Sequence, residues 1–282
     1  MKKSRILALI LALALAVCAF AACNNNEPVN NNTVDDNPTE LNETPEDINP
    51  VALELGKTTL VMGTNAEFEP FEYRENDEIV GYDIETAKAI AASVDMEFGI
   101  EDMAFDSLIT ALASGQIDMV VAGMSVTEER LQQVNFSDPY YRAAQVIIVP
   151  KAGATVTSSA DLAGKKIGVQ EGTTGDIYVE ENVAGAQLNR FKKAVDAAID
   201  LANGRLDAVV LDEQPALRIV AQNDALMVLD EALTEEEYAI AVRKDNPELL
   251  AAINAALADL EATGKKAELL EKYGLNVDED AE

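Results

Sequence analysis

Residues 114–130, SGQIDMVVAGMSVTEER, decide the fold class of this 282-residue chain. Gly115 is typical of a helix end, residues 117–121 form a short apolar run that predicts a buried strand, and small residues follow in a loop. Thr127 or Ser125 then caps a new helix. Because a helix passes through glycine into a buried strand and a loop, the segment predicts an α/β protein.

Arg130 lies in the first turn of that new helix, where the helix dipole mildly disfavours a cation. A bound carboxylate at the loop would compensate, which favours a site for a small anionic or zwitterionic molecule. An Arg130 paired with a neighbouring glutamate on a solvated face explains the spacing equally well. The spacing alone leaves both interpretations open.

The same pattern recurs later in the chain. Residues 112–123, LASGQIDMVVAG, align without gaps with residues 201–212, LANGRLDAVVLD. Two such units predict two similar lobes, although helix–glycine–strand units also recur in any α/β protein.

Ligands of open α/β sheets bind beyond the carboxyl ends of strands. In one copy of the repeated unit that place holds Gly123, Met124 and Ser125, and in the other it holds Asp212. If the lobes face each other, Arg130 and Asp212 lie on opposite walls, which suits the carboxylate and ammonium of an α-amino acid. Asp212 as a simple helix cap is the alternative.

Short β-branched runs alternate with helical segments over residues 51–282. Strands are expected at 59–63, 119–122, 146–149, 166–169, 208–211 and 240–242. Helices are expected at 84–93, 107–113, 128–133, 174–182, 195–202, 215–221 and 247–273. The acidic run 235–237 is expected to be a solvated face.

The composition excludes several classes of function. The net charge of −30 repels nucleic acid. The absence of histidine removes His-based zinc sites and Ser-His-Asp catalysis. Both cysteines, Cys18 and Cys23, lie near the N-terminus, so the remaining chain has no internal disulfide and no thiolate metal site. We expect no metal and no cofactor.

Residues 1–22 have the basic start and short apolar run of a signal peptide. The run ends in FAAC, which resembles the lipobox of bacterial lipoproteins and would make Cys23 the lipidated first residue of the mature chain. Secretion with ordinary cleavage nearby is the alternative. Residues 23–50 are acidic and Asn-rich and predict a disordered tether. We expect a protein anchored by lipid to the outer face of the cytoplasmic membrane.

Over residues 57–275 the chain resembles the extracytoplasmic solute-binding proteins (family 3) of polar amino-acid ABC importers. The matching segments are GTNAEFEPFEY (63–73), GYDIE (81–85), AGMSVTEER (122–130), NFSDPY (135–140), DLAGKKIGVQEGTTG (161–175) and DAVVLD (207–212). Each is weak alone, but their order and spacing are specific.

The resemblance implies a two-lobed, periplasmic-binding-protein-like (type II) clamp with two hinge crossovers, near 143–149 and 238–243. Lobe 1 would hold residues 51–143 plus 240–282, and lobe 2 residues 144–239. Closure around a ligand that touches both lobes would then favour the closed form.

The resemblance also implies roles for the site residues. Arg130 would bind the ligand carboxylate, helped by the Ser125 amide and by Thr174 at a helix start. The ammonium would meet Asp212, the Ser125 hydroxyl and the Gly123 carbonyl. The expected binding residues are Asn65, Phe68, Phe105, Gly123, Met124, Ser125, Arg130, Gln170, Thr173, Thr174 and Asp212.

Selectivity for the ligand side chain is less determined. Phe68 and Phe105 match an aromatic pair that sandwiches the ligand side chain, with plain core packing as the alternative. Asn65 and Gln170 match side-chain contacts, and their neutral amides disfavour an acidic ligand. Glu67 or Glu72 leaves a basic ligand open.

The function implied by the resemblance is capture of a polar L-amino acid, neutral or basic, outside the cell and its delivery to the membrane subunits of an ABC importer. The protein is expected to be a monomer and not an enzyme. The alternatives are an enzyme resembling cyclohexadienyl dehydratases on the same fold, with Glu67 or Glu171 as the acid-base group, and a ligand-sensing module that serves a separate receptor.

Overall fold

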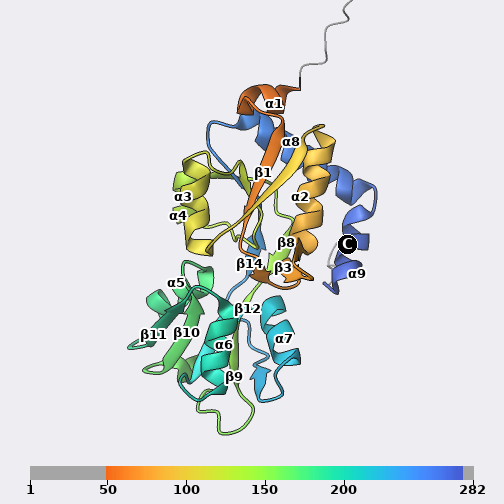
Figure 1. Cartoon of the computed structure of the whole chain (residues 1–282). Coiled ribbons are helices and arrows are strands. Elements are labelled where there is room, and N and C mark those ends of the chain that lie inside the picture. Colours follow the sequence, from red (N-terminus) through yellow and green to blue (C-terminus); the bar gives the residue numbers. More distant parts are fainter. Residues whose placement is uncertain (1–48, 276–282) are drawn as a thin grey trace, which may run out of the picture. The chain divides into compact units, whose positions relative to one another are not determined.

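The computed structural model describes residues 49–275, which contain two five-stranded sheets (Figure 1). The first sheet has the order β5-β1-β6-β15-β7, with β1 at Thr59–Thr64, β5 at Glu97–Asp102, β6 at Met119–Val120, β7 at Asn135–Phe136 and β15 at Ala241–Val242. The second has the order β11-β10-β12-β9-β13, with β9 at Gln145–Pro150, β10 at Lys166–Gln170, β11 at Gln187–Phe191, β12 at Ala208–Asp212 and β13 at Leu226–Val228.

The two sheets have the same plan. In each, the second strand in the order pairs in parallel with both of its neighbours. The fourth strand pairs antiparallel with both of its neighbours. The repeated sequence units supply β6 and β12, the third strand of each order. Asp118 accepts the Val61 N–H at 2.7 Å, and Asp207 accepts the Lys166 N–H at 2.8 Å, so the repeated aspartate fixes its strand against β1 or β10 in both copies.

Helices cover both faces of these sheets. They are α1 (Pro50–Leu55), α2 (Tyr82–Ser93), α3 (Leu108–Ala113), α4 (Glu128–Gln133), α5 (Thr174–Asn182), α6 (Ala194–Ala202), α7 (Glu213–Ala221), α8 (Pro247–Ala262) and α9 (Lys265–Tyr273), with 3-10 turns η1 (Phe105–Ser107) and η2 (Ser159–Leu162). Alternate residues of β1 serve different clusters, since Leu60 and Met62 pack with α2 and α8 while Val61 packs with α3. Figure 1 shows α2 and α3 on either side of β1.

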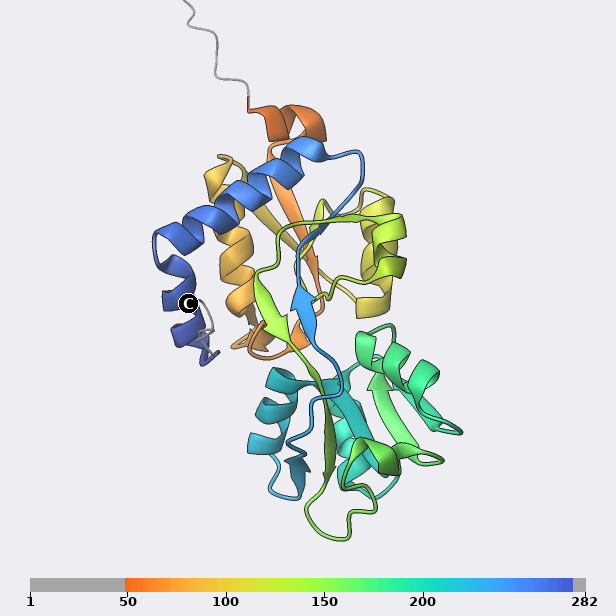
Figure 2. The ribbon, with the colours of Figure 1, turned by 180° about the vertical axis from the view of Figure 1, so that it is seen from behind.

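The chain crosses between the sheets twice, on neighbouring strands. β8 (Tyr141–Ala143) leads to the second sheet, β14 (Glu236–Tyr238) returns from it, and the two pair antiparallel with Tyr238 opposite Tyr141. The view from behind shows these crossings side by side (Figure 2).

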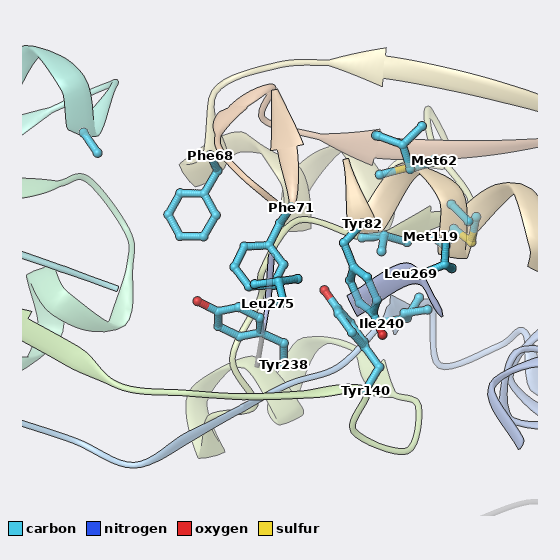
Figure 3. Packing of buried hydrophobic residues seen from close by; sticks show 14 of the residues in the cluster. Met62, Phe68, Phe71, Tyr82, Met119, Tyr140, Tyr238, Ile240, Leu269 and Leu275 are labelled. Carbon is cyan, nitrogen blue, oxygen red and sulfur yellow. The ribbon is translucent and has the colours of Figure 1, made fainter. Parts of the chain in front are cut away.

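An aromatic cluster surrounds the crossings (Figure 3). The Phe71 ring lies edge-on to Tyr82, Tyr141 and Tyr238, with centroids 6.4, 4.9 and 5.2 Å away. Phe71 follows a small sheet strand, β2 (Glu67–Phe68), which pairs with β3 (Glu72–Glu75) and through it with β4 (Glu78–Val80). The ring packing therefore joins this small sheet to both crossings.

The predicted elements are present, with three differences. The helix expected over 247–273 is two helices, because Gly264 adopts a left-handed φ of 76° between them. Several elements were not predicted, namely α1, β2, β3, β4, β5, β7, β8, β11, β13 and β14. β11 shows one reason, since its mostly exposed, polar residues lack an apolar pattern. The signal peptide, Cys23 and most of the tether lie outside the described residues, but Asn49 caps α1 and Pro50 begins it.

No helix within residues 49–275 is both long enough and apolar enough to cross a membrane.

Candidate functional site

A small cavity lies where the first strand–loop unit meets its counterpart in the second sheet. Its lining combines residues of both sheets: Asn65, Phe68, Glu72, Phe105, Ala122, Gly123, Ser125, Arg130, Gln170, Thr173, Thr174 and Asp212. Every predicted binding residue except Met124 is in this set. The Met124 side chain instead packs in the cluster that contains α3 and Val134.

Arg130 is buried at one wall of the cavity, with 6% of its surface exposed. Thr127, one of the two predicted caps, accepts the Arg130 backbone N–H at 3.2 Å and fixes the start of α4. The guanidinium donates to the carbonyls of Ser125 at 2.6 Å and Gly172 at 3.0 Å, and lies 5.4 Å from the centre of the Phe105 ring. Burial lowers the pKa of Arg130. The solvated-face interpretation of Arg130 is therefore wrong.

Asp212 ends β12 and is also buried, at 4% exposure. Its carboxylate accepts the Tyr238 hydroxyl. Its side chain makes no capping hydrogen bond to α7, so the helix-cap alternative fails. Burial, and next the negative charge of Glu236, raise the pKa of Asp212 to about 7. The cavity thus holds a buried cation and a buried acid that ionises near neutral pH.

Two hydroxyls lie between these charges. Ser125 donates to Glu236 Oε2, and Thr174 donates to the same oxygen at 2.8 Å. The Gln145 amide donates to the Thr174 hydroxyl at 3.0 Å. Glu236 was expected on a solvated face, yet it is half-buried because alternate residues of β14 point inward.

The opposite end of the cavity is made of amides and aromatic rings. Gln170 Nε2 donates to Asn65 Oδ1 at 2.9 Å and thereby connects β10 of the second sheet to the loop after β1 of the first. Asn65 in turn donates to the Met103 carbonyl at 2.9 Å. Thr173 caps α5 by accepting the Asp176 N–H, and donates to the Gln170 carbonyl at 2.8 Å.

Gly123 brings the backbone against the Phe68 ring. It has a φ of 52°, and a Cβ atom there would lie 2.8 Å from the ring. Its N–H donates to Asp83 Oδ2 at 2.9 Å. Glycine is required on both counts, because a side chain would be strained and would displace Phe68.

Glu72 is a buried acid in the cavity wall, with 1% of its surface exposed. No amide, hydroxyl or cation of the described residues donates to its carboxyl oxygens, but the neighbouring acid Asp83 shares a hydrogen bond with it. Burial, followed by the charge of nearby Asp83, raises the pKa of Glu72 well above its ordinary value. Burial also raises the pKa of Asp83 to about 6, although Gly123 and Tyr140 donate to it.

The other two acids named from the sequence lie elsewhere. Glu67 pairs with Lys193, and Glu171 pairs with Lys192 at 2.9 Å; neither lines the cavity. Sequence reasoning missed Ala122, Gln145 and Glu236, and none of them has a residue type or spacing that indicates a site. Within residues 49–275 no group of three or more acidic, histidine or cysteine side chains could hold a metal ion.

Comparison with known proteins gives a consistent result. The family model for bacterial extracellular solute-binding proteins, family 3, matches residues 60–276. The arginine-binding extracellular protein ArtP of Bacillus subtilis is 40% identical over 225 residues, which cover 78% of this chain and 88% of ArtP. The ABC transporter arginine-binding protein 1 of Escherichia coli is 37% identical, covering 75% of this chain and 88% of that protein.

Among solved structures, the P235GK mutant of ArgBP from T. maritima superimposes with a TM-score of 0.76 at 43% identity, covering 79% of this chain and 98% of ArgBP. The fold is thus the mixed α/β fold of the amino-acid-binding proteins, as predicted. The chain belongs to family 3 of the bacterial extracellular solute-binding proteins.

Proposed function

We propose that this protein captures a basic L-amino acid, arginine first among the candidates, outside the cell and delivers it to the membrane subunits of an ABC importer. The observation that carries the proposal is the cavity that places buried Arg130 and buried Asp212 together. Buried charges are costly unless paired, and a zwitterion supplies a partner for each of them.

In this proposal Arg130 binds the ligand α-carboxylate through two parallel hydrogen bonds. The N-terminus of α5, which begins at Thr174, adds its dipole to the same end. The α-ammonium binds the Asp212 carboxylate, the Ser125 hydroxyl and the Gly123 carbonyl. Phe68 and Phe105 line the path of the ligand side chain.

Glu72 decides between a neutral and a basic side chain. Burial and Asp83 raise the pKa of Glu72 and favour its neutral form, whereas a ligand cation beside it would favour the ionised carboxylate. A guanidinium or ammonium would supply both charge and donors. The names of the two curated relatives, both arginine-binding proteins, support the same choice.

We also propose the lobe boundaries 51–143 plus 240–282 and 144–239, with the hinge at the predicted crossovers near 143–149 and 238–243, which directly follow β8 and β14. Several contacts join the two parts around the cavity: Gln170 with Asn65, Arg130 with Gly172, Lys192 with Asp106 and Lys193 with Glu67. A ligand that bridges Arg130 and Asp212 would add to these contacts and favour the closed form.

A non-catalytic role fits the acids of the cavity better than the dehydratase alternative does. The two acids nominated for acid-base work, Glu67 and Glu171, are held in partly exposed ion pairs outside the cavity. Anchoring of the chain through a lipid on Cys23, and a monomeric state, are parts of the proposal that concern its presentation to the importer.

Calorimetric titration tests the proposal. The purified protein, stripped of co-purified ligand, is titrated with each common L-amino acid and with cystine. We expect saturable binding of arginine and of few others, abolished by Arg130→Ala. Replacing exposed Arg205, which pairs with Asp200 away from the cavity and the crossings, is the matched control and should leave binding intact. Absence of binding to every amino acid would refute the proposal.

A further inference from the structure

Glu236 joins elements of both sheets next to the cavity: it does not line the cavity itself, but it binds two residues that do, Ser125 and Thr174. Its Oε2 atom accepts hydrogen bonds from Ser125, in the loop after β6, and from Thr174, at the start of α5. Its Oε1 atom accepts from Thr234 at 2.7 Å. One carboxylate thus engages three hydroxyls.

A hydroxyl group has one hydrogen to donate, so these bonds determine what the two cavity hydroxyls can do. Thr174 donates to Glu236 and accepts from the Gln145 amide, which leaves it little capacity for a ligand. Ser125 also gives its hydrogen to Glu236, but its oxygen keeps lone pairs. In the cavity that Asp212 also lines, the Ser125 hydroxyl is therefore an acceptor.

An acceptor beside a carboxylate attracts an N–H cation and repels another oxygen acceptor. We propose that Glu236 is a positioning residue that turns the Ser125 hydroxyl toward the ligand ammonium and so makes the site demand an α-amino group. This inference rests on the proposed function. Without Glu236, the Ser125 hydroxyl could rotate and donate its hydrogen to a ligand oxygen, which would weaken the selectivity of the site for an α-amino group.

The charge of Glu236 acts in the same direction. Glu236 is close enough to Asp212 to raise the pKa of that acid and close enough to Arg130 to raise the guanidinium pKa against the effect of burial. Its negative charge attracts an arriving ammonium and also offsets part of the positive charge of Arg130.

The test compares L-arginine with 5-guanidinopentanoate, which keeps the guanidinium and the carboxylate but lacks the α-ammonium. The measured quantity is the dissociation constant of the analogue divided by that of arginine. We expect Glu236→Gln to weaken arginine binding at least tenfold and analogue binding less than threefold, because a hydrogen bond to a charged group is lost only for arginine.

Glu237→Gln is the matched control, since it removes the same charge from the adjacent, exposed position of β14. It should leave the ratio unchanged. Ser125→Ala should lower the ratio as Glu236→Gln does, and the double variant should lower it no further, because both changes remove one interaction.

Two results would overturn the inference. One is an equal loss of affinity for arginine and for the analogue in Glu236→Gln. The other is tighter arginine binding by that variant, which would mean that the Glu236 carboxylate competes with the ligand. If that variant unfolds, Thr234→Val loosens the same carboxylate, and an unchanged ratio would count against the inference. A wild-type protein that binds no amino acid would refute the proposed function itself, and the inference with it.

Discussion

The affinity for the amino acid should fall steeply as the pH drops below 7. Asp212 must be ionised to bind the ligand ammonium, but burial and the charge of Glu236 raise its pKa to about 7 in the free protein. At pH 6 most of the protein would carry a proton on Asp212, and that proton must leave before the ammonium can bind. Ligand binding and proton release are therefore linked.

The size of the effect follows from the pKa. The ammonium would stabilise the carboxylate and bring the pKa of Asp212 in the complex back toward its ordinary acidic range. Each pH unit below the free-protein pKa then costs about 1.4 kcal/mol, or tenfold in affinity. Between pH 7.5 and pH 5 we expect the dissociation constant to rise about 80-fold, with about half a proton released per ligand at pH 7.

Calorimetry at several pH values, in two buffers of different ionisation enthalpy, measures both quantities. Asp212→Asn should bind more weakly and lose the step centred near pH 7. Glu72→Gln is the companion variant, because the pKa of Glu72 is also raised. It shows whether titration of Glu72 contributes to the pH dependence of binding in addition to titration of Asp212. A wild-type dissociation constant that changes less than threefold over this range, or an Asp212→Asn protein that keeps the wild-type slope, would refute the reasoning.

Three further predictions concern single residues. Arg130→Lys should weaken binding at least 100-fold, because a point charge cannot replace two parallel hydrogen bonds and reach both carbonyls. The control Arg205→Lys, at an exposed position away from the cavity, should bind normally in the same titration. Asp212→Asn should gain about 2–3 kcal/mol of stability relative to wild type as the pH rises from 5 to 8. The reason is that the raised pKa of Asp212 in the folded protein makes its deprotonation destabilise the wild type. Urea unfolding of both proteins at both pH values measures the difference in their free energies of unfolding, and a difference that does not change with pH contradicts the prediction. Gly123→Ala should cost about 1–3 kcal/mol, seen as a lower Tm, because its positive φ and the Phe68 ring leave no room for Cβ; an unchanged Tm would show that the ring can move freely.

Much of the fold could be predicted because the buried strands have a strong pattern. The run 119–121 and its repeat at 208–210 are apolar on both faces, as strands in the middle of a covered sheet must be. β11 carries exposed polar residues, so its position at a sheet edge comes from pairing with β10 and leaves no trace in its own sequence.

The site residues also fall into two groups, those that the sequence predicts and those that only the structure reveals. Arg130 and Asp212 follow recognisable strand–loop units, so their meeting could be expected once two similar lobes were inferred. Glu236 lies in a run of three glutamates that has the composition of a solvated surface, and only its pairing in β14 turns it toward Ser125. Met124 shows the opposite error, since its neighbours line the cavity while its own side chain points into the core.

The place of β15 has a consequence for how the chain acquires its structure. This strand lies between β6 and β7, yet it follows the whole second sheet in the sequence. The second sheet draws all five strands from residues 145–228, so it can form from one continuous stretch, whereas β7 has no neighbour in its sheet until residues 241–242 arrive. Closing so long a loop is slow relative to local pairing. During folding, the second sheet should therefore be complete before the first, although its strands begin later in the sequence.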